Sequence, residues 1–416
     1  MDERRSHDGS ERPQHEFRLQ ITLFLAALLF YSLAVWRAVE RAEIDLASLA
    51  VYFDGYLYIE IAKSFPLPYA TEGRAYLGHA PGYPALIFLL EKILPGGWGI
   101  ATIAASVLPA AGAVVVFHSL ARQLGIRSLW PVAGFAIANA RWVSTAGSAH
   151  AEGLAMLLVL LCFLDHFRGH RFRSVLWLSM AGMTRFPALL LVAPLALGLL
   201  FFQKDRRPGS FAALGFPILV FALFNLYLNQ HILDFEGISA AHAVFWDTRI
   251  SWPLDAWLSH GGRGALGTKH IYFAVTYGFL AFYFATAAIG FFAPRFRRNG
   301  LLVLPVWLAV QLLFHLSLDG KPAVTAFTRL VVLAWPAALL IAALALERRI
   351  PKWIAGAVIL ALAIHGVALN ERFIAGAVSK QGKSQPFLKA MIHRLDSDEV
   401  RWIPLRLSRR GIKPAD

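Results

Sequence analysis

The sequence predicts an all-α protein, a polytopic transmembrane helical bundle. Three observations support this prediction. The 416 residues are 57% hydrophobic and only 16% charged, whereas a typical soluble domain is about 25% charged. A single soluble core stops growing near roughly 250–300 residues, so it could not bury this much apolar surface. Long apolar runs recur along the chain, and basic residues gather in the short gaps between them. The composition therefore excludes an ordinary soluble enzyme, a disordered chain and a disulfide scaffold.

About eleven apolar runs are long enough, or nearly so, to cross the membrane as helices of roughly 20 residues. They are Leu19–Trp36, Trp98–Ala121, Ser128–Val143, Gly153–Phe167, Ser174–Met183, Phe186–Phe202, Phe211–Leu228, Ile271–Phe292, Leu301–Leu316, Val324–Leu346 and Trp353–Leu369. A further run, Ala80–Leu94, is too short to span and contains two prolines and two charged residues. We interpret it as an interfacial helix in the first extracytoplasmic loop.

The basic residues indicate the orientation of the bundle. With Ala80–Leu94 outside the membrane, five basic clusters fall on the side of the N-terminus, and the positive-inside rule makes that side cytoplasmic. The clusters are Arg122/Arg127, Arg168/Arg171/Arg173, Lys204/Arg206/Arg207, Arg295/Arg297/Arg298 and Arg348/Arg349/Lys352. The net charge of +14 therefore indicates membrane orientation, and no nucleic-acid partner is expected.

We expect one transmembrane domain over residues 1–370, followed by a basic C-terminal tail over residues 371–416. An odd number of passes would place that tail outside, a position that the positive-inside rule disfavours, although long tails follow the rule loosely. The protein is expected to be an integral, multi-pass protein of the bacterial inner membrane. Its functional site is expected to face the outside, because the extracytoplasmic segments contain most of the non-basic polar residues.

The first outer segment contains candidate site residues. At helical spacing, Asp54 and Tyr58 share one face of a surface helix, which would hold a carboxylate just above the lipid headgroups. The alternative for Asp54 is a helix N-cap or a solvated loop acid. His79 lies in a turn rich in proline and glycine, where it would face water and could donate to an anion or simply be solvated.

Further candidates lie where other spans meet the outer surface. Glu152 and His150 precede the fourth span, although Glu152 could instead complement a helix dipole. Arg185 joins two short apolar runs and is expected in the outer half of the membrane, where an arginine needs a polar partner. Arg329 follows Lys321 near the start of the tenth span. Because no carboxylate lies nearby in the sequence, both arginines suggest a phosphate ligand, and the alternative is a buried pair with an acid.

Several signals are absent from the sequence. It contains no P-loop, no Rossmann fingerprint and no metal-binding pattern of the His-x-Glu or CxxC type. A cytosolic nucleotide is therefore not expected as substrate. We expect no cofactor, and a divalent metal is not indicated.

Five segments together resemble the GT-C membrane glycosyltransferases, especially the branch similar to GPI mannosyltransferase II (PIG-V-like). They are the acidic first loop at Phe53–Ala62, the turn His79–Pro84, the entry Ser148–Glu152, the segment Met183–Pro187 and the late Thr328–Leu330. They occur in the order and with the approximate spacing of that family. The chain departs from the pattern in having one acid where many relatives have a pair, and Leu330 where relatives have an aromatic residue.

The resemblance implies an inverting glycosyltransferase that moves a sugar, mannose or a similar hexose or pentose, from a polyprenyl-phosphate carrier to an acceptor hydroxyl outside the cytoplasm. The acceptor would be a glycan, a glycolipid or a protein, and the bilayer would hold the donor. In this interpretation Asp54 is the general base, while Arg185 and Arg329 hold the departing phosphate. The other substrate-binding candidates are His79, Tyr58, His150, Glu152 and Lys321.

Two other function classes remain open from the sequence. A transporter or flippase of lipid-linked sugars would also need outward-facing arginines, but transporters commonly contain paired broken helices, and we find one broken pair near Arg185. A non-catalytic subunit of a membrane complex would have its polar residues scattered rather than gathered on one side.

Overall fold

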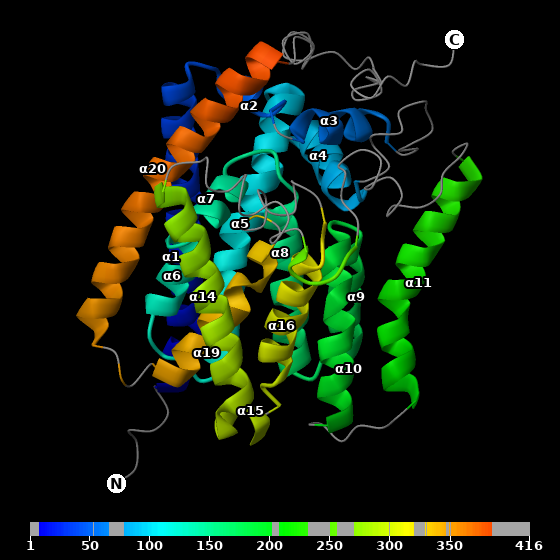
Figure 1. The fold of residues 1–416 in the computed structure, drawn as a ribbon, viewed down its shortest axis with the longest axis vertical. Coiled ribbons are helices and arrows are strands. Elements are labelled where there is room, and N and C mark those ends of the chain that lie inside the picture. Colours follow the sequence, from blue (N-terminus) through cyan, green and yellow to red (C-terminus); the bar gives the residue numbers. More distant parts are fainter. Residues whose placement is uncertain are drawn as a thin grey trace.

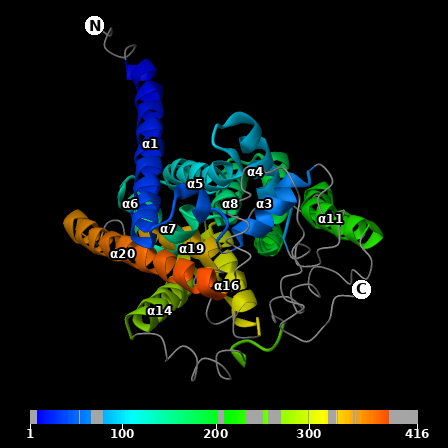
Figure 2. The same cartoon turned by 90° about the horizontal axis from the view of Figure 1, so that it is seen from above.

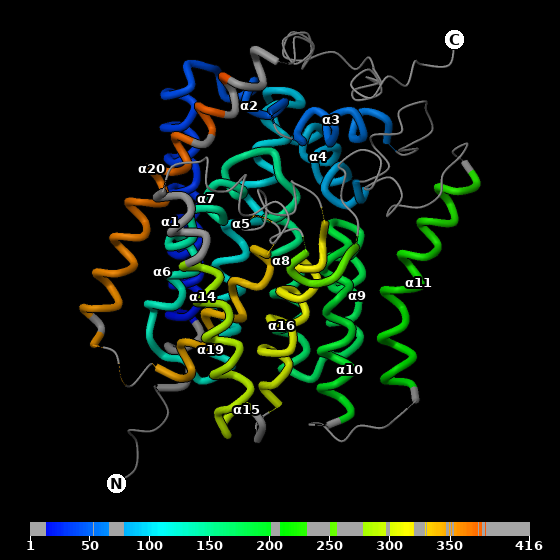
Figure 3. The backbone as a smooth tube through the Cα atoms, viewed as in Figure 1, coloured from blue at the N-terminus to red at the C-terminus, as the bar shows by residue number. Residues whose placement is uncertain are grey.

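The computed structural model describes residues 8–52, 54–65, 79–201, 208–231, 250–255, 270–298, 300–319, 329, 331–346, 349 and 351–384. Over these residues the chain is a bundle of helices with no strand beyond one isolated bridge, Ile250–Leu318 (Figure 1, Figure 3). The all-α bundle expected from the sequence is confirmed.

The helices follow the predicted order. They are α1 (Asp8–Ala42), α2 (Leu46–Leu49), α3 (Gly55–Lys63), α4 (Gly82–Ile93), α5 (Gly97–Gln123), α6 (Trp130–Ile137), α7 (Ala140–Ala146), α8 (Glu152–Phe167), α9 (Arg171–Gly182), η2 (Phe186–Leu191), α10 (Val192–Phe201), α11 (Pro208–His231), α14 (His270–Phe292), α15 (Pro294–Arg298), α16 (Val303–Leu316), η4 (Val331–Ala334), α19 (Trp335–Leu346) and α20 (Lys352–Ser384). Each of the eleven predicted runs coincides, over its described residues, with a helix or with a broken pair of helices.

The third apolar run was expected to form one continuous helix, and this expectation is wrong. It breaks into α6 and α7 at Asn139, whose Oδ1 accepts a hydrogen bond from the backbone N–H of Trp142 at 3.2 Å and so caps the second helix. A buried polar link holds the break: the Tyr31 hydroxyl of α1 donates to the carbonyl of Ala136 at 3.0 Å and accepts from Trp142 Nε1 at 2.8 Å. A polar side chain that caps the backbone explains why a continuous apolar run fails to form a continuous helix.

The last helix is longer than its apolar run. α20 continues through the boundary expected at residue 370, so the predicted division between domain and tail falls inside a helix. Glu371 is tied to α1 by Arg37 and Arg41, each 3.3 Å from the carboxylate. These ion pairs stabilise polar helical turns beyond the point where the apolar pattern stops.

Exposed apolar surface on the outer helices identifies an integral membrane protein. Among the described residues, four helices are long and apolar enough to span a bilayer: Gln14–Ala42, Gly97–Gln123, Gly209–Gln230 and Trp353–Gly376. Four shorter apolar helices accompany them: Phe186–Leu200, Gly278–Phe292, Val303–Leu316 and Val331–Leu346. On α1 the exposed side chains Leu25, Leu29 and Leu33 recur every four residues, which lines one face of the helix with leucine.

The centre of the bundle is α5, which packs against α1, α4 and α8. The approach of α8 is very close, because a Cβ on Gly153 would lie 2.7 Å from the carbonyl oxygen of Ser106 on α5. This contact fixes the N-terminal end of α8 against the core. In both views α11 lies at one edge of the molecule, and α1 and α20 lie at the other (Figure 1, Figure 2).

The short helices α2, α3 and α4 lie together at one end of the bundle (Figure 1). Asp45 caps α2 by accepting from the backbone N–H of Ser48. α3 begins at Gly55, where any Cβ would overlap the carbonyl oxygen of Ala50 and lie 2.6 Å from Cβ of Ala149. The start of α3 therefore sits directly against the turn that precedes α8, and only glycine allows this approach.

We predict that Gly55→Ala destabilises the protein, because the added methyl must displace backbone; such overpacking costs about 1–3 kcal/mol. The apparent Tm in detergent, measured by thermal scanning fluorescence, should fall by several degrees. Gly215→Ala on α11 is the control, since a Cβ there meets nothing within 4 Å and its Tm should hold or rise slightly. Equal effects of the two substitutions would contradict the tight packing at Gly55.

Candidate active site

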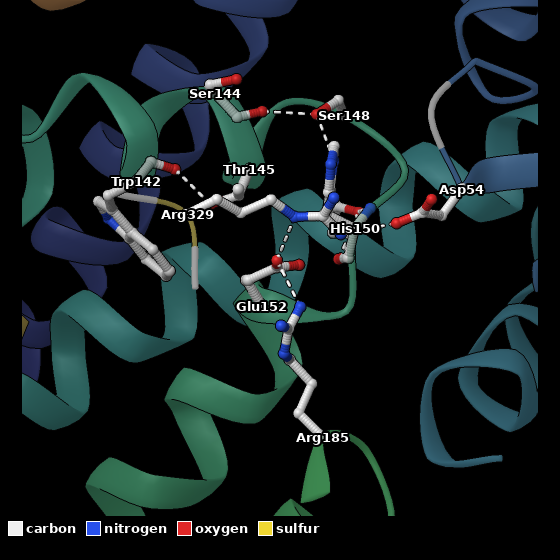
Figure 4. A network of polar contacts seen from close by, with 10 residues as sticks. Asp54, Trp142, Ser144, Thr145, Ser148, His150, Glu152, Arg185 and Arg329 are labelled. Atoms are coloured by element: carbon white, nitrogen blue, oxygen red, sulfur yellow. Dashed lines mark hydrogen bonds and ion pairs between the residues drawn. The ribbon is translucent and has the colours of Figure 1, made fainter. Parts of the chain in front are cut away.

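Four charged side chains from distant parts of the chain meet in one cluster (Figure 4). Asp54 immediately precedes α3, Glu152 is the first residue of α8, Arg185 immediately precedes η2, and Arg329 lies two residues before η4. Each therefore sits at a helix end, where the chain turns and a side chain can point into the space between helices. All four are candidates named from the sequence, and the structure brings them together.

Arg329 is the centre of this cluster. Its Nε donates to Glu152 Oε1 at 2.6 Å, and its Nη2 donates to Asp54 Oδ2 at 2.8 Å. Arg185 Nη1 donates to the same oxygen of Glu152 at 2.5 Å. Figure 4 shows Glu152 between the two guanidinium groups and Asp54 on the other side of Arg329. The chain of contacts thus runs Asp54, Arg329, Glu152, Arg185.

Both arginines have a carboxylate partner, although no acid lies near either of them in the sequence. Glu152 is 33 residues from Arg185 and 177 from Arg329, so the pairing could not be read from local sequence. Glu152 is fully buried, and a buried carboxylate requires compensating charge and hydrogen bonds. The structure therefore shows the alternative arrangement, in which each arginine pairs with a buried acid.

Asp54 occupies the N-cap position of α3, but its side chain makes no capping hydrogen bond. The carboxylate reaches Arg329 instead, and a quarter of the side chain stays accessible. Burial by itself would raise the pKa of Asp54, but the positive charge of Arg329 and its hydrogen bond outweigh that effect and hold the pKa well below its usual range. Asp54 is therefore ionised at neutral pH, as expected.

His150 lies in the turn before α8 and is nearly completely buried. Its Nδ1 is 2.7 Å from the Ser148 hydroxyl, and its backbone N–H and carbonyl both contact Ser106 Oγ at 3.3 Å. Burial, assisted by the charge of Arg329, lowers the pKa of His150 to about 3. The imidazole is therefore neutral at physiological pH and can orient a hydroxyl without adding charge.

Tyr58 and His79 form an aromatic wall beside Asp54. The Tyr58 ring meets the rings of His79 and Tyr83 edge-on, with centroids 4.8 Å apart in both pairs. Burial, together with the negative charges of Asp54 and Glu152, raises the pKa of Tyr58 above its usual value. The expectation that His79 faces water is wrong: only 7% of the residue is exposed, because the Pro81 turn folds it against Tyr58.

The sequence interpretation missed a third arginine. Arg141, at the start of α7, is close enough to Arg329 for the two charges to interact. Counting Arg141 with the cluster gives three guanidinium groups and two carboxylates, and this sum of formal charges is positive. The available signal was its place at the outer end of a span that has no other arginine or lysine there. Lys321, the remaining candidate, lies outside the described residues.

Metal-binding groups are not found in the part of the chain that the structure describes. No cluster of three or more His, Cys, Asp or Glu side chains there could hold a metal ion. The two acids of the site are instead engaged by arginines. The expectation that the protein uses no cofactor remains a prediction.

The site lies at the end of the bundle opposite to the basic turns. α3 and α4, which follow Asp54 and His79 in the chain, are at the top of Figure 1, whereas α15, which carries Arg295, is at the bottom. The separation agrees with the sequence pattern, in which the polar non-basic residues and the basic clusters alternate between the two sides.

Comparison with known proteins identifies the fold. No protein-family model matches the chain, and no curated protein sequence does. The crystal structure of ArnT from Cupriavidus metallidurans in the apo state matches with a TM-score of 0.50 and 15% identity, over 90% of this chain and 77% of that one. The crystal structure of the same protein bound to undecaprenyl phosphate matches with a TM-score of 0.49 and 16% identity, over the same shares of the two chains.

The chain thus has the fold seen in the crystal structure of ArnT. This likeness spans nine-tenths of the chain. At 15% identity it establishes the architecture alone. It does not select the PIG-V-like branch, which remains a prediction.

We predict that His150 makes stability fall with acidification. An unfolded histidine takes up a proton near pH 6.5, whereas the folded pKa is about 3, so between these values the folded state loses stability as pH falls. The loss is at most about 1.4 kcal/mol per pH unit. Between pH 7.5 and pH 5, the apparent Tm of the wild type should therefore fall more than that of His150→Gln, which lacks this titration. Parallel curves for the two proteins would contradict a buried neutral His150.

Proposed function

We propose that the protein is an inverting glycosyltransferase that moves a sugar from a polyprenyl-phosphate carrier to an acceptor hydroxyl on the non-cytoplasmic face of the membrane. The observation that carries the proposal is the Arg329 bridge, which joins the carboxylate of Asp54 to the buried pair of Glu152 and Arg185. A candidate base, Asp54, is therefore in direct contact with a candidate phosphate-binding group, Arg329. The ArnT-like fold supports the reaction class.

The arginines are suited to the phosphate of the donor. Guanidinium has five N–H donors in a planar fork, and the contacts to Glu152 and Asp54 use two of those on Arg329. Among the described residues, Nη1 of Arg329 makes no hydrogen bond, and Arg185 makes only the one to Glu152, so the other donors of both arginines are proposed to bind phosphate oxygens. As the sugar–phosphate bond breaks, negative charge grows on the phosphate, and fixed cations favour that transition state over the ground state.

Asp54 is suited to the base. In the proposed step, the acceptor hydroxyl attacks the anomeric carbon opposite to the phosphate, its proton passes to Asp54, and the bonding electrons of the sugar–phosphate link leave with the phosphate. The ion pair keeps Asp54 deprotonated but also makes it a weak base. When the donor phosphate binds Arg329, the electrostatic interaction between Arg329 and Asp54 weakens, and the basicity of Asp54 rises. Donor binding would therefore prepare the base.

The surrounding groups suit hydroxyl recognition. His150 is neutral and held by Ser148, and Glu152 is fixed by two arginines, so both can orient sugar or acceptor hydroxyls without large movement. Tyr58 and His79 supply a buried aromatic edge next to Asp54. Mannose or another hexose or pentose is the proposed sugar, following the PIG-V-like resemblance, and a glycan, glycolipid or protein is the proposed acceptor. Lys321 is proposed as a further phosphate contact, and no metal or cofactor is invoked.

We predict that Asp54→Asn abolishes sugar transfer, because the amide cannot accept the proton; loss of a general base lowers rates about 10²–10⁴-fold. The assay uses purified protein in detergent, radiolabelled polyprenyl-phosphate sugars and lipid or glycan acceptors. Asp45→Asn is the matched control, since an asparagine still caps α2 and its activity should be unchanged. Full activity of Asp54→Asn would remove Asp54 from the mechanism. If neither the wild type nor Asp54→Asn transfers sugar, but the variant moves the donor lipid between the leaflets of vesicles, the protein is a flippase.

We predict that the site faces away from the cytoplasm in a bacterial inner membrane. The chain has one cysteine, the buried Cys162, so single reporter cysteines can be placed in a Cys162→Ala background. Trp252→Cys, at a residue that is 85% exposed in an outer segment, should react with an impermeant maleimide in intact spheroplasts. Arg168→Cys should react only after permeabilisation. The reverse labelling pattern would overturn the orientation and the proposed location of the reaction.

A further inference from the structure

Three buried oxygen or nitrogen acceptors near the site have no hydrogen-bond partner among the described residues. They are Glu152 Oε2, Gln311 Oε1 and His315 Nε2. Each belongs to a residue that is at most 1% exposed. Buried polar atoms in native proteins nearly always have partners, so a group of such atoms beside a proposed substrate site indicates where a ligand supplies them.

The three residues that carry these acceptors all lie near Arg185. Glu152 binds Arg185 directly through its other oxygen. Gln311 on α16 donates from Nε2 to the carbonyl of Pro187 at 2.9 Å, two residues after Arg185. His315 is one turn further along α16, and it lies close enough to Arg185 for the two groups to interact electrostatically. α16 thus brings two polar side chains to the end of the cluster opposite to Asp54.

The hydrogen bond of His315 fixes the character of its free nitrogen. Nδ1 is 2.7 Å from the carbonyl oxygen of Gln311, and a carbonyl can only accept. Nδ1 therefore carries the proton, and Nε2 of the neutral ring is an acceptor. The Oε1 atom of Gln311 and the carboxylate oxygen of Glu152 are also acceptors. The three atoms consequently need donors, and a phosphate, whose oxygens accept from the arginines, provides none.

We propose that His315, with Gln311 and Glu152, forms a sugar-binding subsite whose acceptors bind hydroxyl groups of the transferred sugar. The proposal rests on the proposed function, because the arginines hold the phosphate that positions the sugar. It divides recognition by chemistry: donors on Arg185 and Arg329 bind the phosphate, and acceptors around Arg185 bind the O–H groups next to it. His315 is then a positioning and specificity residue, whereas Asp54 acts on the other substrate.

The test measures binding of defined lipids to the purified full-length protein in detergent. The probes are polyprenyl-phosphate mannose, glucose, galactose and arabinose, and polyprenyl phosphate without a sugar, each competed against a fluorescent polyprenyl phosphate. His315→Phe should weaken binding of the preferred sugar lipid about 3- to 10-fold, the effect of one hydrogen bond, and leave binding of the sugar-free lipid unchanged. His315→Gln, which keeps an acceptor near the position of Nε2, should recover most of the loss.

Two controls separate recognition from structure. His118→Phe alters another buried histidine, near the far end of α5, and should change neither affinity. Deoxy analogues of the preferred sugar lipid, each lacking one hydroxyl, identify the contact. The analogue without the contacting hydroxyl should bind the wild type and His315→Phe equally, because the hydrogen bond is already absent.

The outcomes distinguish the two proposals. If His315→Phe weakens binding of the sugar lipid and of the sugar-free lipid equally, the sugar subsite is wrong and His315 is structural. The same conclusion follows if His315→Phe weakens binding of every deoxy analogue by the same factor. If the wild type binds sugar lipids no better than the sugar-free lipid, the subsite is wrong while the phosphate site stands. If the wild type binds no polyprenyl phosphate at all, the proposed function fails and the subsite fails with it.

Discussion

The guanidinium of Arg329 holds the site together. Its hydrogen bonds join Asp54, which is 275 residues away in the chain, to Glu152, which is 177 residues away. Each partner needs the others, because a buried carboxylate or guanidinium left unpaired is strongly destabilising. The same contacts set the chemistry, since they keep Asp54 ionised and leave a net positive charge when Arg141 is included. One side chain thereby links the residue before α3, the start of α8 and the entry to η4.

The rest of the fold provides helix ends in the right places. α8, α9 and η2 are shorter than a full membrane crossing, so Glu152 and Arg185 come to the same level, at the end of the bundle that carries α3 and α4. The near contact of Gly153 with Ser106 fixes that level against α5. α3 completes the cluster from above, and its tight start at Gly55 brings Asp54 within reach of Arg329. Short helices and close backbone contacts, rather than long regular spans, position the charged groups.

The site also separates two kinds of hydrogen-bonding group. The arginines supply donors, and the buried atoms of Glu152, Gln311 and His315 supply acceptors. A lipid-linked sugar has the complementary pattern, with an acceptor-rich phosphate beside a donor-rich ring. Electrostatic interactions and hydrogen bonds are stronger where water is excluded, so in the proposed function this arrangement would give discrimination as well as affinity. In the proposed subsite, a sugar hydroxyl would be the partner of His315 Nε2, which has no hydrogen-bond partner among the described residues.

The sequence alone determined the fold class, because apolar runs and basic gaps report directly on the partition of each segment between lipid and water. It also identified Asp54, Glu152, Arg185 and Arg329 as candidate site residues. A charged residue in or near an apolar span has a cost in free energy, which makes it a candidate for a functional role. Only the tertiary structure decided which of them touch, that His79 is buried, that Asn139 breaks a span and that α20 continues past residue 370. These features depend on hydrogen bonds and ion pairs between distant residues, which hydropathy and local spacing do not encode.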